Sequence, residues 1–222
     1  MGNTIQELQA EIKDWLDDPL KEGIEAALEN ATTFTSRLQE ILKSNPSAGR
    51  TLGPLIGKVK GLQKRLNNIE PINWVSISGG HLAIGHRPGS KLISDIRLQG
   101  GTHILTLLSE SEGAKVIQKE ALKKELEWLW LGMSSAEPPS KDRMSEFTSL
   151  FDEMINILDN QGRIYLHCSA GIHRTGMISY AFLRYLGYAK EGAQTNLQRL
   201  RPTTHEGVGE KRMAWGELFY KR

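Results

Sequence analysis

The sequence predicts an α/β domain with a central, mostly parallel sheet flanked by helices, preceded by an all-helical extension. From residue 71 onward, short apolar strand segments alternate with helical segments, a pattern typical of parallel sheets with helices on their faces. Before residue 71, apolar residues recur only at helical spacing. We therefore divide the chain into a helical extension, 1–70, and an α/β domain, 71–222.

The extension is expected to contain four short amphipathic helices. The second opens at Asp18-Pro19, because proline is tolerated in the first turn of a helix. The others are expected near residues 4–16, 35–43 and 54–67. Short amphipathic helices cannot bury their apolar stripes alone, so they must pack on one another, on the rest of the chain or on a partner. Partner binding through residues 1–70 is therefore one of the expected roles.

The elements of the α/β domain follow from turn residues and periodicity. Gly79-Gly80 predicts a hairpin between its first two strands. Trp128 and Trp130 are expected on opposite faces of their strand, packed in the core. The expected strands are 74–77, 81–84, 103–108, 128–131 and 163–166, and the expected helices are 90–98, 113–125, 142–160 and three that begin near 174, 189 and 208.

Bulk composition narrows the class of protein. The 222 residues carry a formal net charge of +2, which gives no global argument for binding nucleic acid or membranes. A single cysteine excludes an internal disulfide framework and a multi-cysteine metal site. The scattered histidines lack ligand spacing, so we expect no metal and no cofactor. Neither a secretory signal nor a run of about 18 apolar residues is visible, and we expect a cytoplasmic protein without a membrane span.

The most informative segment is residues 167–176, His-Cys-Ser-Ala-Gly-Ile-His-Arg-Thr-Gly. An apolar strand precedes it and a helix follows, so its loop lies where helix N-terminal N–H groups can bind an oxyanion. Gly171 permits tight curvature, and Arg174 offers a two-pronged phosphate contact. The same positive surroundings favour Cys168 as a thiolate, the nucleophilic form. Backbone from Ser169, Ala170, Gly171, Ile172 and His173 is expected to line the phosphate site, with Thr175 bonded to the sulfur and His167 supporting the loop.

These residues resemble the His-Cys-x5-Arg-Ser/Thr signature of cysteine-dependent protein tyrosine and dual-specificity phosphatases. The resemblance covers about residues 71–222 and includes Leu200-Arg201-Pro202, where dual-specificity phosphatases commonly have Arg-Pro. It implies the cysteine-phosphatase fold and a metal-independent reaction. Cys168 would attack phosphorus to form a phosphocysteine, which water then hydrolyses. His173 departs from the family, which more often has a small residue there.

The general acid is the point at which the sequence departs from the family. The family supplies an aspartate from a loop about thirty residues before the cysteine, but here that position falls near Ser135. The nearest carboxylates are Glu137 and Asp142. We favour Glu137 as the donor to the leaving group, with Asp142 or neither residue as alternatives.

The expected substrate is a phosphorylated protein carrying phosphotyrosine, phosphoserine or phosphothreonine. The same chemistry on a phosphoinositide, nucleotide or RNA end is the alternative, because a fold does not determine its substrate. The third hypothesis is a binding module that recognises phosphorylated partners without hydrolysing them.

Overall fold

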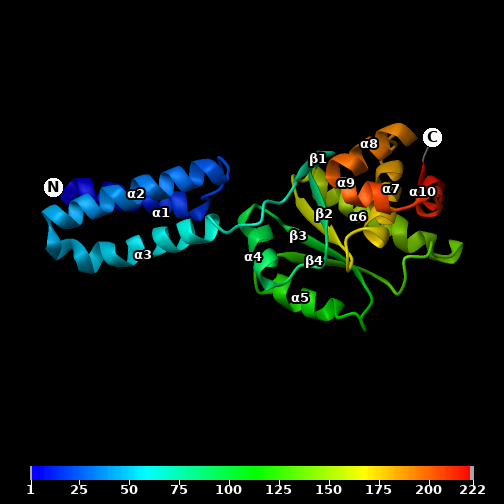
Figure 1. Cartoon of the computed structure of the whole chain (residues 1–222), viewed down its shortest axis with the longest axis horizontal. Helices are drawn as coiled ribbons and strands as arrows, with labels where there is room; N and C mark the ends of the chain where they lie inside the picture. Colours follow the sequence, from blue (N-terminus) through cyan, green and yellow to red (C-terminus); the bar gives the residue numbers. More distant parts are fainter. Residues whose placement is uncertain (1, 221–222) are drawn as a thin grey trace. The chain divides into compact units, whose positions relative to one another are not determined.

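A computed structural model describes residues 2–220 of the chain (Figure 1). Within it, the chain divides into two compact units, residues 1–70 and 71–222, and each is described by itself. None of the described helices combines the length and apolar character needed to cross a membrane.

The N-terminal unit is a helical bundle with its own core. It contains α1 (Gly2–Asp17), α2 (Ile24–Ser44), a 3-10 turn (Pro46–Ala48) and α3 (Gly49–Leu66). Each helix contributes fully buried side chains to this one core, among them Ile12 from α1, Leu38 from α2 and Val59 from α3. The predicted second and third helices are therefore wrong as separate elements: residues 24–44 form one helix, and Pro19 lies in the turn that precedes it.

The second unit is built on a five-stranded sheet, as predicted. Its strand order is β1-β2-β5-β3-β4, with only the β1–β2 pair antiparallel. The strands are β1 (Val75–Ile77), β2 (Gly80–Gly85), β3 (His103–Leu108), β4 (Glu127–Met133) and β5 (Arg163–His167). The β5 strand, which leads into the signature, thus lies in the middle of the sheet.

Helices cover both faces of this sheet (Figure 1). The α4 (Ser90–Leu98) and α5 (Ala114–Leu122) helices share one apolar core with it, and the other face packs against the remaining helices. These are α6 (Met144–Asp159), α7 (His173–Tyr185), α8 (Lys190–Leu200), α9 (Pro202–Gly207) and α10 (Glu210–Gly216), with 3-10 turns at Lys141–Arg143 and Glu217–Phe219.

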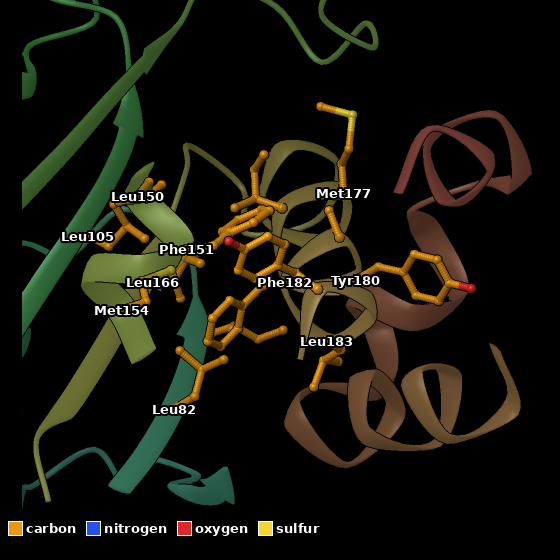
Figure 2. Close-up of a cluster of buried hydrophobic side chains, with 14 of the residues drawn as sticks. Leu82, Leu105, Leu150, Phe151, Met154, Leu166, Met177, Tyr180, Phe182 and Leu183 are labelled. Atoms are coloured by element: carbon orange, nitrogen blue, oxygen red, sulfur yellow. The ribbon is translucent and has the colours of Figure 1, made fainter. Parts of the chain in front are cut away.

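The larger core immobilises the helix that follows the signature. Phe151 of α6 lies at its centre (Figure 2), with its ring centroid 5.6 Å from that of Phe182 and 5.4 Å from that of Tyr185, both on α7. Burying a side chain of this size contributes roughly 1.5–3 kcal/mol. Because α7 is anchored along its length, its N-terminal turn is held rigidly against the end of β5.

The two tryptophans of β4 depart from the prediction. Trp128 and Trp130 stack on the same side of the strand, with ring centroids 5.6 Å apart and an interplanar angle of 19°. Residues two apart in a strand share a face, so the expectation of opposite faces was wrong. Trp130 keeps 38% of its surface exposed, so it is not a core residue.

Candidate active site

The signature forms the connection between β5 and α7, at the carboxyl end of the central strand. Helices switch faces on either side of β5, since α4 and α5 lie on one face and α6 and α7 on the other. Such a switch point leaves a crevice beyond the strand ends, where ligands bind in open α/β sheets. The loop of residues 168–173 occupies this position.

The backbone of the loop curls around the Cys168 sulfur. Gly171 has a φ of 73°, and a Cβ there would lie 2.2 Å from the carbonyl oxygen of Gly85, so a glycine is required. This turn brings the Gly171 N–H to 3.3 Å from Sγ. Cys168 is only 3% exposed, so its thiol is buried.

The surroundings of Cys168 favour its thiolate. Burial, the largest single influence, raises the pKa of the thiol, but hydrogen bonds from Thr175 and from the Gly171 and Ile172 N–H groups together lower it below its ordinary value. The buried Thr175 hydroxyl has no nitrogen or oxygen partner among the described residues, which leaves it for the sulfur. The arrangement therefore increases the fraction of Cys168 present as thiolate, the nucleophilic form, at a given pH.

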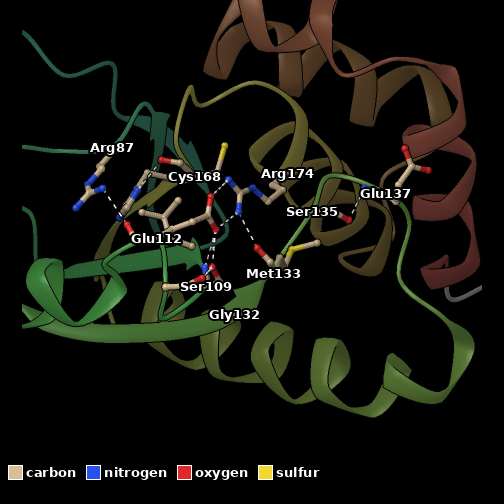
Figure 3. Close-up of polar contacts among 12 residues, drawn as sticks. Arg87, Ser109, Glu112, Gly132, Met133, Ser135, Glu137, Cys168 and Arg174 are labelled. Carbon is tan, nitrogen blue, oxygen red and sulfur yellow. Dashed lines mark hydrogen bonds and ion pairs between the residues drawn. The ribbon is translucent and has the colours of Figure 1, made fainter.

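Arg174 is held in place by a carboxylate from another segment (Figure 3). Its two terminal nitrogens each donate to one oxygen of Glu112 at 2.7 Å, and Nη1 also donates to the Met133 carbonyl at 2.6 Å. The Arg174 hydrogen bonds lower the pKa of Glu112 to about 2, so this carboxylate stays charged. The guanidinium is thereby pre-oriented beside Cys168, as a bidentate phosphate ligand must be.

Three further groups fix the outside of the loop. Arg201 donates to the Gly171 carbonyl at 2.8 Å, and the buried Thr204 hydroxyl donates to the same oxygen at 2.6 Å. The Arg87 N–H donates to the Ser169 carbonyl at 2.9 Å. Because these carbonyls point outward, the N–H groups of the intervening peptides are free to face the crevice.

His167 is fully buried behind the nucleophile. Its Nδ1 lies 3.0 Å from the Cys168 carbonyl oxygen, and its Nε2 lies 2.9 Å from the Thr106 hydroxyl on β3. Burial, opposed only in part by the hydrogen bond to Cys168, lowers the pKa of His167 to about 4, so the ring is neutral near pH 7. Both ring nitrogens are thus engaged within the protein, and the supporting role of His167 stays a prediction.

The loop of residues 134–140 turns Glu137 away from Cys168 (Figure 3). Its carboxylate pairs with Lys211 of α10, and this hydrogen bond lowers the pKa of Glu137. Arg212 donates to the Ala136 carbonyl at 2.7 Å and holds the loop against α10. Asp142 lies in the 3-10 turn before α6. In this conformation the Glu137 carboxylate is paired with Lys211 and does not face the sulfur, so the assignment of the general acid to Glu137 stays a prediction.

The structure gathers the predicted loop residues 167–175 into one site, although His173 is exposed. It also adds groups that sequence reasoning missed: Glu112, Thr106, Trp128 and the Met133 carbonyl. All follow or belong to β3 and β4, and their place beside the carboxyl end of a parallel strand was the only available signal. Within residues 2–220, no group of three or more metal-ligating side chains comes together.

Comparison with known proteins agrees with this geometry. Residues 94–187 match a family model described as a polymorphic toxin system DSP-PTPase phosphatase. That segment begins in α4 and includes both Cys168 and Arg174. No curated protein sequence matches the chain.

Solved structures share the fold at low sequence identity. The active form of Tk-PTP is 16% identical, with a TM-score of 0.54 over 65% of this chain and 93% of that one. Kinase associated phosphatase, with a serine in place of its catalytic cysteine, is 16% identical, with a TM-score of 0.57 over 68% and 94%. A protein tyrosine phosphatase (putative) from Leishmania major is 15% identical, with a TM-score of 0.53 over 69% and 100%.

A buried thiol inside a ring of N–H donors, with an arginine fixed beside it, defines an enzyme that cleaves phosphate esters by nucleophilic attack. Residues 94–187 match a DSP-PTPase phosphatase model, and the α/β unit shares the fold of protein tyrosine and dual-specificity phosphatases, so the chain carries a domain of the cysteine-dependent phosphatase type.

Proposed function

We propose that this phosphatase dephosphorylates proteins, at phosphotyrosine and also at phosphoserine or phosphothreonine. The observation that carries the proposal is the burial of the nucleophile: Cys168 is 3% exposed, and the N–H of Gly171 in the loop donates to its sulfur. A phosphate on a long, rigid aryl side chain reaches such a sulfur with little approach of the substrate backbone. Phosphotyrosine is therefore the expected best substrate.

The reaction proceeds in two displacements. The Cys168 thiolate attacks phosphorus, the S–P bond forms and the ester P–O bond breaks, with the electron pair passing to the leaving oxygen. N–H groups of residues 169–174 and the Arg174 guanidinium stabilise the charge on the three phosphoryl oxygens. Water then attacks phosphorus, the S–P bond breaks, and inorganic phosphate and the thiolate are released.

Leaving-group protonation is assigned to Glu137, which must first leave Lys211. The 134–140 loop lies on the surface, and Glu137 is exposed, so this change requires no repacking of the core. An aryl leaving group needs less assistance than an alkyl one because its oxyanion is more stable. The displaced acid therefore also favours phosphotyrosine.

A non-protein phosphomonoester is the second candidate. It is favoured by the likeness to PTPMT1, which is 17% identical with a TM-score of 0.53 and whose structure in complex with PI(5)P is also known. Two exposed side chains next to the loop, Arg87 and His86, could meet the additional charge of a phosphoinositide or nucleotide.

A substrate panel separates these readings. The full chain and its Cys168→Ser variant are offered phosphotyrosine and phosphoserine peptides, a phosphoinositide, a nucleotide and a 5′-phosphorylated RNA. We expect Cys168-dependent phosphate release with the highest kcat/KM on the phosphotyrosine peptides. A higher kcat/KM on a non-protein substrate would move the assignment to the second candidate. Tight binding of phosphopeptides without release from any substrate would instead indicate a recognition module.

Residues 1–70 are proposed to bind a protein partner or substrate. Their α3 helix carries Arg50, Lys58, Lys60, Lys64 and Arg65 and no acidic residue, so it offers a cationic surface. Removing residues 1–68 should lower kcat/KM on a phosphoprotein while leaving para-nitrophenyl phosphate unaffected. Equal loss on both would show that the unit supports the fold instead.

A further inference from the structure

A continuous chain of hydrogen bonds links the edge strand β4 to the nucleophile. The Trp128 Nε1 donates to the Thr106 hydroxyl at 3.0 Å, and that hydroxyl lies 2.9 Å from His167 Nε2. The His167 Nδ1 lies 3.0 Å from the Cys168 carbonyl oxygen. Thr106 and His167 are both 0% exposed, so no solvent competes for these contacts.

The chemistry of the groups determines which atom donates in each hydrogen bond between Trp128 and Cys168. A carbonyl oxygen only accepts, so His167 Nδ1 must carry the proton. A neutral ring then has Nε2 as an acceptor, and the Thr106 hydroxyl must donate to it. An indole N–H only donates, so Trp128 fills the acceptor side of that hydroxyl and directs its single proton toward His167.

We propose that Trp128 and Thr106 are positioning residues that set the tautomer and ring orientation of His167 and, through it, the peptide group of Cys168. In the other tautomer, the Nδ1 lone pair would face the lone pairs of the Cys168 carbonyl. Because the peptide is planar and trans, fixing that carbonyl also fixes the Ser169 N–H in the opposite direction. The first N–H of the phosphate loop is therefore aimed by groups on β3 and β4.

Trp128 itself is held by its surroundings. Its ring stacks on Trp130, and the ammonium group of Lys115 on α5 lies 5.2 Å from the Trp128 ring centroid and 4.7 Å from that of Trp130. Trp130 differs in its hydrogen bond: its Nε1 donates to the Leu108 carbonyl at 2.8 Å and not to Thr106. The two indoles thus form a matched pair for an experiment.

The inference rests on the proposed nucleophilic role of Cys168, but the thiol can be measured without turnover. Cys168 is the only cysteine of the chain, so its alkylation by iodoacetamide, followed by mass spectrometry across pH, reports one group. Arg174, with its partner Glu112, is the charged group that acts on this thiol, and Arg87, His86 and Arg174 act on His167 behind it. None of these groups is altered in the variants below.

Trp128→Phe keeps the ring and removes the N–H, and Thr106→Val removes the hydroxyl at nearly constant volume. At a pH below the thiol pKa, we expect alkylation to slow roughly threefold in Trp128→Phe and about tenfold in Thr106→Val, the range of one hydrogen bond. Thr106→Ser should restore the wild-type rate, and Trp130→Phe should match wild type. kcat should fall in the same order, with KM for para-nitrophenyl phosphate little changed.

Ring 15N shifts of His167 provide a readout that does not depend on catalysis. The wild type should show the Nδ1–H tautomer alone, and Thr106→Val a mixture or the reverse. Unchanged alkylation and an unchanged tautomer in both Trp128→Phe and Thr106→Val would overturn the inference, as would equal effects of Trp128→Phe and Trp130→Phe. If the wild type is alkylated normally but releases no phosphate, the proposed function fails while the positioning role is still tested.

Discussion

The ion pair between Glu112 and Arg174 should stabilise the folded protein, and the Glu112→Gln variant tests by how much. A carboxyl whose pKa falls from 4.5 to about 2 on folding stabilises the folded state by about 3 kcal/mol at neutral pH. The Glu112 side chain keeps 34% exposure, so solvent screening reduces this figure, and we expect about 1–2 kcal/mol. Urea unfolding at pH 7 measures the difference directly.

The pH dependence of that difference identifies its origin. Between pH 4.5 and 2, the unfolded chain binds a proton at Glu112 that the folded chain does not, so the stabilisation is lost as the pH falls through this window. The difference in the free energy of unfolding between wild type and Glu112→Gln should therefore be largest above about pH 5 and should vanish toward pH 2. Glu120→Gln, which removes an exposed carboxylate that bonds Lys123, is the control and should leave stability unchanged.

The Glu112→Gln change should also affect catalysis through Arg174, whose side chain is 10% exposed. Arg174 would keep its hydrogen bond to the Met133 carbonyl and at most one to the new amide oxygen, in place of the charged two-pronged contact. A guanidinium free to rotate loses part of its bidentate contact with phosphate, and we expect kcat/KM to fall about tenfold, equivalent to about 1.4 kcal/mol. Wild-type stability and kcat/KM in Glu112→Gln would refute the reasoning. A gap in stability that persists unchanged down to pH 2 would refute its electrostatic origin.

Three further variants test the rest of the site, and a fourth, Gly57→Ala in α3, is a glycine control outside it. Gly171→Ala should lower kcat/KM more than about a hundredfold, because its Cβ would lie 2.2 Å from the Gly85 carbonyl oxygen. Gly57→Ala places its Cβ in open space on α3, and urea unfolding should show a free energy of unfolding higher by about 0.5–1 kcal/mol. Arg201→Ala removes one of the two side-chain donors to the Gly171 carbonyl and leaves the Thr204 hydroxyl. Steady-state kinetics should show a severalfold rise in KM for para-nitrophenyl phosphate, whereas an unchanged KM would contradict that support. Glu137→Gln should abolish the basic limb of the kcat/KM profile on an alkyl phosphate if Glu137 is the acid, and an intact basic limb would exclude it.

The contiguous part of the site was predictable because its geometry is local. A strand, a loop with one glycine and a helix N-terminus follow one another in residues 163–185, so short-range structure alone brings Cys168 and Arg174 into one loop. The α/β class was predictable for a similar reason, since alternation of strands and helices is a property of the chain's order.

The partners of the loop could not be found in this way, because they come from segments distant in sequence. Glu112 lies 62 residues before Arg174, and Thr106 lies 61 before His167. Their side chains meet the loop only because β3 pairs with β5 in a defined register, with Thr106 opposite His167. Polar residues in a strand or a turn carry no signal that distinguishes such partners from ordinary surface groups.

The segment between β3 and α5, together with the first turn of α5, therefore also contributes to the site. The Ser109 N–H and hydroxyl each donate to Glu112 at 2.9 Å, Glu112 orients Arg174, and Lys115 one turn later covers the indole of Trp128. Residues 109–115 thus contact both Arg174, which binds the phosphate, and Trp128, which is hydrogen-bonded toward His167. A homologous domain that keeps the His-Cys-x5-Arg sequence but loses this turn should retain a reactive cysteine and lose efficient turnover, so an intact signature alone does not establish an active phosphatase.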